Sequence, residues 1–68
     1  MTFDAVESLF RQKGVAPVVG VAKVLGITHG AVAQWKRKKG GLIPELQARK
    51  LAEKYPELKF DASAYQNH

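Results

Sequence analysis

Four consecutive cationic side chains, Lys36 to Lys39, follow a segment that carries almost no charge. Clustered cations neutralise the phosphates of a nucleic acid and release its condensed counterions, which gives affinity without sequence preference. Two nearby side chains can do more: the Gln34 amide can pair with adenine N6 and N7, and the Arg37 guanidinium can reach a guanine or a phosphate. A charge run is usually only a solvated surface, so its meaning depends on the elements that position it.

The chain is short and basic. Its 68 residues allow one domain, assigned to 1–68, and carry 11 Lys and Arg against 6 Asp and Glu, a net charge of +5. A chain of this length buries only about 60% of its unfolded surface, which leaves no room for a large enclosed pocket. No acidic residue lies between Glu7 and Glu45, so we expect one side of the domain to carry a positive potential, as binders of polyanions do.

Several other classes of function lack the residues that they need. There is no cysteine, and His29 and His68 are too few for a metal site without a carboxylate cluster. No catalytic arrangement is visible, and the glycines lack the spacing of a dinucleotide fingerprint. No segment has the roughly 18 apolar residues of a membrane span, and MTFDAVES does not resemble a signal peptide. We therefore expect a soluble cytoplasmic protein, not an enzyme, that needs no metal, cofactor, small molecule or membrane.

Apolar spacing predicts an all-α domain of four to five short helices. The first covers 2–13 and begins at Thr2 as N-cap, and the second covers 17–25. A β-strand competes for the valine-rich second segment, but no alternation of period two supports it. The third helix covers 28–38 and the fourth 44–55. The apolar faces of the first, second and fourth helices consist of Phe3, Val6, Leu9, Phe10, Val18, Val21, Ala22, Leu25, Leu46, Ala48, Leu51, Ala52 and Tyr55.

The last segment, about 57–68, is a tail with few structural signals. Leu58 and Phe60 are expected to dock onto the core, and Asp61 is expected to cap one last helical turn that reaches Tyr65. Phe60 and Tyr65 would then complete the core. The rival interpretation is that they contact a second copy of the chain, because an apolar tail on so small a domain can serve a partner.

The connection between the second and third helices decides the architecture. Only Gly26, Ile27 and Thr28 join them, and helices joined so tightly cross steeply, near 90–120°. Such a corner needs a small residue at the close approach, a residue tolerant of positive φ at the turn, and apolar residues facing inward on the third helix. The sequence supplies these requirements, in order, at Ala22, Gly26, Val32 and Trp35. This is the spacing of a helix-turn-helix DNA-binding unit, which we place at about 18–37, with Trp35 in the core rather than stacking on a base.

The outward face of the third helix carries the candidate DNA contacts. Gly30 and Ala33 keep this face small, so the helix can lie deep in a major groove. We predict base contacts from Thr28, His29, Gly30, Ala33, Gln34 and Arg37. We predict phosphate contacts from Val18, Lys36, Lys38 and Lys39. For His29 and Gln34, an inert surface position is the competing interpretation.

The stretch AKVLGITHGAVAQWK, with the later IPELQARKLAEK, resembles the Cro-type repressors of lambdoid bacteriophages and related prophage regulators. The resemblance covers most of the chain, from about Val15 to Tyr65. It implies a lambda-repressor-like architecture and a protein of the bacterial host cytoplasm. It also implies binding of duplex operator DNA as a dimer, which represses transcription. The small size of the domain further suggests a weak homodimer that forms on DNA.

The chain departs from the family pattern at the DNA-facing positions. Val18 stands where a polar, phosphate-binding residue often opens the second helix, so only a backbone N–H can contribute there. Gly30 and Ala33 stand where polar base readers are frequent, which makes contact with thymine methyl groups more important. The sequence does not distinguish repression from activation. A second hypothesis is a protein-interaction adaptor that uses the same helical scaffold to bind an acidic partner.

Overall fold

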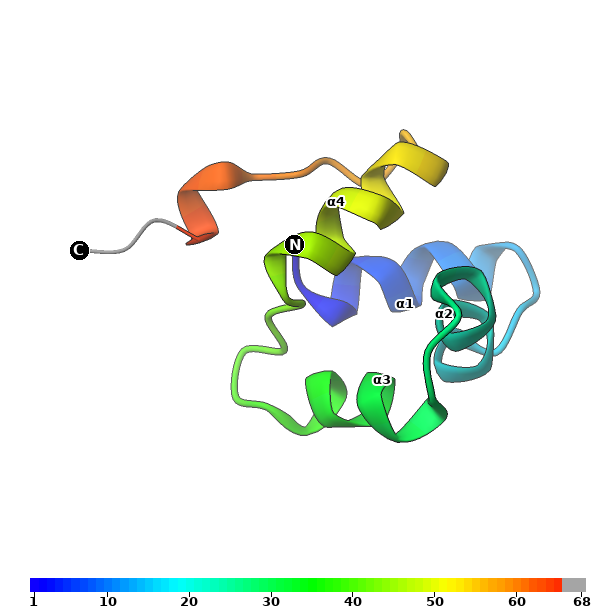
Figure 1. Cartoon of the computed structure of the whole chain (residues 1–68). Helices are drawn as coiled ribbons and strands as arrows, with labels where there is room; N and C mark the ends of the chain where they lie inside the picture. The colour runs from blue at the N-terminus through cyan, green and yellow to red at the C-terminus, as the bar shows by residue number, and fades with distance from the viewer. Residues whose placement is uncertain (66–68) are drawn as a thin grey trace.

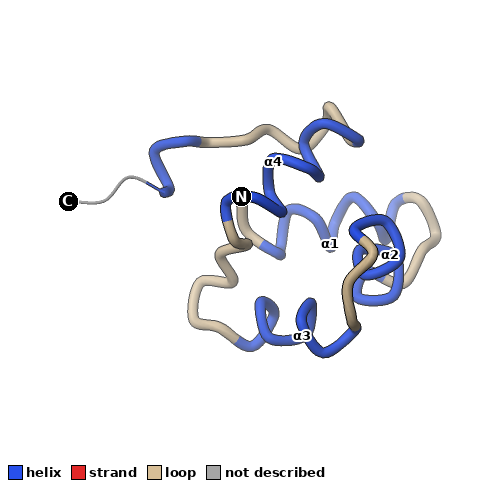
Figure 2. The backbone as a smooth tube through the Cα atoms, viewed as in Figure 1, coloured by secondary structure: helices blue, strands red, loops and turns tan. Residues whose placement is uncertain are grey.

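The structure is a computed structural model, and it describes residues 1–65. It is all-α, as predicted (Figures 1 and 2). The elements are α1 (Phe3–Gln12), α2 (Pro17–Leu25), α3 (His29–Arg37), α4 (Glu45–Lys54) and a short 3₁₀ turn, η1 (Ala62–Tyr65). Within the described residues the extended pairing is limited to one isolated bridge between Thr2 and Leu42. The helical prediction for the valine-rich second segment is therefore confirmed over the strand alternative.

Helix α1 forms one wall of the core through Phe3, Val6 and Phe10, which are all buried. The predicted side-chain cap at Thr2 is not formed, although Thr2 occupies the N-cap position with extended backbone. The N–H of Phe3 instead donates to the Gly41 carbonyl at 2.8 Å. This bond ties the start of α1 to the segment that follows α3.

Helix α2 crosses α1 at Gly20. This glycine is buried, and a Cβ built on it would lie 2.6 and 2.7 Å from two carbons of the Phe10 ring and 2.7 Å from Val15. The sequence assigns Gly20 a conformational cost in a helix. The packing supplies the reason for that cost, because only a residue without a side chain fits this crossing.

The predicted corner between α2 and α3 is present. Gly26 has φ +68°, in the left-handed region that glycine adopts without strain, and the Ile27 N–H donates to the Ala22 carbonyl at 3.0 Å. The two helices pack against each other beside this turn, and Ala22 is 2% exposed. In Figure 1, α2 is seen nearly end-on while α3 lies across the view, so the helices cross and do not run side by side.

The segment between α3 and α4 contributes a core residue, Ile43, that is not among those predicted from the sequence. Gly40 and Gly41 both have positive φ, and they reverse the chain after the basic run. The turn brings Ile43 into the core, where it is fully buried and its N–H donates to the Met1 carbonyl at 3.0 Å. The loop after α3 is thus fixed at both Gly41 and Ile43 by backbone bonds to the start of the chain.

Helix α4 covers the core through Ala48 and Leu51, with Ala52 and Tyr55 partly buried. The prediction that Leu46 extends this face is wrong, because Leu46 is 62% exposed. At 100° per residue, Leu46 lies roughly 140° from Leu51 around the helix and so turns toward solvent.

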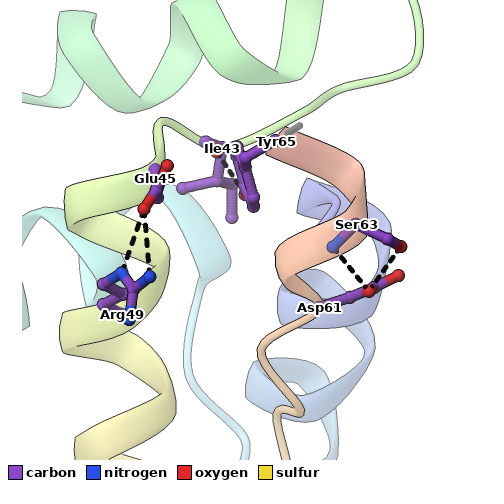
Figure 3. A network of polar contacts seen from close by, with 6 residues as sticks. All are labelled: Ile43, Glu45, Arg49, Asp61, Ser63 and Tyr65. Carbon is purple, nitrogen blue, oxygen red and sulfur yellow. Dashed lines mark hydrogen bonds and ion pairs between the residues drawn. The ribbon is translucent and has the colours of Figure 1, made fainter. Parts of the chain in front are cut away.

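The tail docks onto the core as predicted. Leu58 is 5% exposed, and the rings of Phe60 and Tyr65 stack with centroids 5.5 Å apart. Asp61 accepts hydrogen bonds from the backbone N–H and hydroxyl of Ser63, at 3.0 and 2.6 Å, and starts the last turn (Figure 3). These bonds lower the pKa of Asp61. The Tyr65 hydroxyl donates to the Ile43 carbonyl at 2.5 Å, and its burial raises the pKa of Tyr65.

Candidate nucleic-acid interface

The rotation of α3 about its own axis is set by its two buried side chains. Val32 is fully buried and Trp35 is 7% exposed, as predicted for core residues. The start of the helix is fixed by Thr28, whose hydroxyl oxygen accepts a hydrogen bond from the Ala31 N–H at 3.1 Å. Because a helix is rigid over two turns, these anchors determine which residues of α3 face solvent.

The predicted base-contacting residues lie on the solvent side of α3. Thr28, His29 and Gly30 are exposed at the start of the helix, Gln34 and Arg37 are exposed further along it, and Ala33 is half-buried between them. A Cβ on Gly30 would meet only the Thr28 hydroxyl within 4 Å, at 3.9 Å, so the space over this glycine is open. The face therefore combines a low, open surface with the Gln34 amide, which can donate and accept hydrogen bonds, and the Arg37 guanidinium, which can only donate them.

The cations after this face differ in their surroundings. Across residues 1–65, no carboxylate oxygen lies within 4 Å of the charged nitrogens of Arg37, Lys38 or Lys39. All three are exposed, and Lys38 is extended where the helix ends. A phosphate can bind a cation that has no protein partner without breaking an existing ion pair.

Lys36 is different, because it turns toward α1. Its Nζ lies 3.7 Å from Oε2 of Glu7, and the same oxygen lies 3.2 Å from the Arg11 guanidinium. Lys36 is one of the predicted phosphate contacts, and its place in the sequence gives no sign of this ion pair. The spacing of Glu7 and Arg11 is visible in the sequence, but the approach of Lys36 depends on how α1 and α3 pack.

The remaining predicted phosphate contact, Val18, is half-buried in the first turn of α2. Its side chain packs against the core, so only its N–H can face an anion. The first N–H groups of a helix have no intrahelical acceptor, and Pro17 at the first position has no N–H to give. The residues predicted to shape the corner lie where expected: Ala22, Val32 and Trp35 are buried, and Gly26 forms the turn.

Among residues 1–65, no three His, Cys, Asp or Glu side chains are grouped closely enough to hold a metal ion. His29 stands exposed at the start of α3, and His68 lies outside the described residues. None of the helices described is both long enough and apolar enough to pass through a lipid bilayer.

Comparison with known proteins adds no family to this description. No protein-family model matches the chain, and no curated protein or solved structure matches it significantly.

Proposed function

We propose that this protein binds duplex DNA through α3 and regulates transcription as a Cro-like repressor that occupies an operator. The observation that carries the proposal is the two-sided character of α3. Val32 and Trp35 anchor one side in the core, while Gln34 and Arg37 stand exposed on the other. The inner side of this helix is packed in the core, and its outer side is small at its centre. It is followed by Lys38 and Lys39, which have no carboxylate partner among residues 1–65, so it suits insertion into a major groove.

In this proposal only a few side chains recognise the DNA sequence. Gln34 pairs with an adenine through N6 and N7, and Arg37 reaches a guanine or a phosphate. Gly30 and Ala33 bring the helix backbone close to the base edges, and the Ala33 methyl group can contact a thymine methyl. Thr28 and His29 lie at the helix start, where recognition helices commonly touch bases or phosphates.

Affinity without sequence preference comes from the cations and a helix terminus. Lys38 and Lys39 follow α3 and hold the phosphates beside the groove, each releasing counterions from the DNA. The N–H of Val18 contributes at the positive end of the α2 dipole. The exposed side of α3 and the cations that follow it then form one continuous contact surface along the duplex.

Two copies of the chain are required for a long enough site. One recognition helix reads only a few base pairs, so two subunits on a pseudo-palindrome are expected. In a domain this small the contact between copies is limited, and we expect the free protein to be largely monomeric. Gel filtration that shows a tight dimer at micromolar concentration would contradict this part of the proposal.

The salt dependence of duplex binding tests the proposal directly. Fluorescence anisotropy with a mixed-sequence duplex, at several salt concentrations, gives the slope of log affinity against log salt. Lys39→Met should lower the magnitude of this slope by about 0.9, the value for one lost phosphate contact on B-DNA. Lys59→Met is the matched control, because the segment between α4 and η1 lies on the far side of the molecule from α3 (Figure 1).

The control variant should leave the slope unchanged. Equal slopes for both variants would show that the surface after α3 is not the contact, and an absence of duplex binding would refute the proposed function. Binding to an acidic protein that survives when duplex binding is absent would favour the adaptor hypothesis instead.

A further inference from the structure

One carboxylate lies between two cations at the edge of the proposed DNA surface. Oε2 of Glu7 is 3.7 Å from the Lys36 Nζ and 3.2 Å from the Arg11 guanidinium, so one oxygen serves both partners. The Glu7 side chain is 23% exposed, whereas those of Lys36 and Arg11 are 54% and 66% exposed. Glu7 is thus the least exposed of the three side chains, and the longer Lys36 and Arg11 side chains extend toward its carboxylate.

The position of this group on the fold follows from helix packing. Glu7 and Arg11 are one turn apart on α1, and Lys36 is one turn after the buried Val32 on α3. Since α1 packs against α3, Lys36 falls on the flank of α3 that faces α1. Asp4, one turn before Glu7, lines a hollow beside the same α3 terminus together with Lys36 and Lys38. The acidic start of α1 therefore lies against the start of the basic run.

We infer that Glu7 withholds Lys36 from DNA phosphates and thereby limits the affinity of the protein for random sequence. The inference rests on the proposed function and adds a residue outside α3 that limits the affinity for DNA. To contact a phosphate, Lys36 has to leave its carboxylate partner, so the exchange gains less than a contact by an unpaired cation. The Glu7 carboxylate also repels any phosphate that approaches this flank.

A role in stabilising the fold explains this ion pair less well than a role in DNA binding does. Exposed ion pairs contribute little to stability, because solvent screens them and the long side chains lose freedom. The net effect of Glu7 is then expected in DNA affinity rather than in unfolding. It lowers the affinity for correct and random sites alike, since the phosphate contact that it suppresses does not depend on sequence.

The first comparison is between Glu7→Gln and Glu53→Gln, which remove the same charge. Glu53 is exposed on α4 and, within residues 1–65, forms no ion pair. Releasing Lys36 adds about 0.9 to the magnitude of the salt slope on a random duplex. At 50 mM salt this corresponds to an affinity gain on the order of tenfold over the unsubstituted protein. Glu53→Gln should leave the slope unchanged, and equal slopes for the two variants would overturn the inference.

The second comparison removes Lys36 in two backgrounds. Lys36→Met should leave the slope of the unsubstituted protein nearly unchanged, but lower its magnitude by about 0.9 in the Glu7→Gln background. A full loss of 0.9 in both backgrounds would show that Lys36 already contacts phosphate and would overturn the inference. Far-UV circular dichroism checks that each variant is folded. If the unsubstituted protein does not bind duplex DNA at all, the proposed function itself fails, which is a different result from either outcome above.

Discussion

Replacing Gly20 by alanine separates local preference from packing, because the two predict opposite signs. In a helix interior, alanine is favoured over glycine by about 1 kcal/mol. The added Cβ, however, would lie 2.6 Å from Cδ2 and 2.7 Å from Cε2 of Phe10, and 2.7 Å from Cγ1 of Val15, well inside ordinary contact at 3.4 Å or more.

The Phe10 ring has little freedom to move away. It is 2% exposed, and the Tyr55 ring packs edge-on against it with centroids 5.3 Å apart. Val15 is 41% exposed and can shift more easily. Overpacking of a core costs about 1–3 kcal/mol. Subtracting the helical gain of about 1 kcal/mol leaves a net destabilisation of about 0–2 kcal/mol, with a central value near 1.

Thermal unfolding followed by circular dichroism measures this difference. For a domain of 60–100 residues, 1 kcal/mol corresponds to a change of about 4–8 °C in the midpoint, so Gly20→Ala should lower Tm by roughly 5 °C. Gly30→Ala is the matched control in α3, where the nearest atom to the new Cβ is the Thr28 hydroxyl at 3.9 Å. It should stabilise the protein by about 0.5–1 kcal/mol. A rise in Tm for Gly20→Ala as large as that for Gly30→Ala would refute the close crossing of α1 and α2.

Two further predictions concern the corner and the tail. Ala22→Leu should destabilise the fold by about 1–3 kcal/mol, because Ala22 is 2% exposed where α2 and α3 meet; an unchanged urea midpoint would contradict this contact. Burial raises the pKa of Tyr65 above its ordinary 10.0, so above about pH 10 the unfolded chain loses a proton that the folded chain keeps. Stability should therefore fall as pH rises past 10 and level off above the folded pKa. Urea titrations at pH 9 and 11 should show a smaller decrease in Tyr65→Phe, and an equal decrease would contradict the partial burial of the hydroxyl.

Much of the fold could be predicted because local rules and tertiary packing agree. The corner residues Gly26 and Thr28 have the backbone and cap that their types favour. The helical spacing of Val32 and Trp35 identifies the buried side of α3, and so also identifies Gln34 and Arg37 as exposed. These inferences needed only the helical period and the chemistry of glycine and threonine.

The features that were missed depend on contacts between distant segments. Gly20 looks unfavourable in a helix until the Phe10 ring is placed against it. Ile43 follows two glycines in a loop, and its burial depends on backbone bonding to Met1. The ion pair of Lys36 joins two helices separated by a third, so no local pattern indicates it. Leu46 is a different kind of error, because the helical period itself turns it away from Leu51.

Selection of binding sites from a randomised pool of duplex DNA tests the central claim, that the exposed side of α3 reads a DNA sequence. The unsubstituted protein should enrich a pseudo-palindrome whose half-sites are centred about 10 base pairs apart, or a multiple of that spacing. Gln34→Ala should enrich the same dyad with the preference for adenine lost at one position of each half-site. The absence of any enriched motif, or an identical motif for both proteins, would contradict the account.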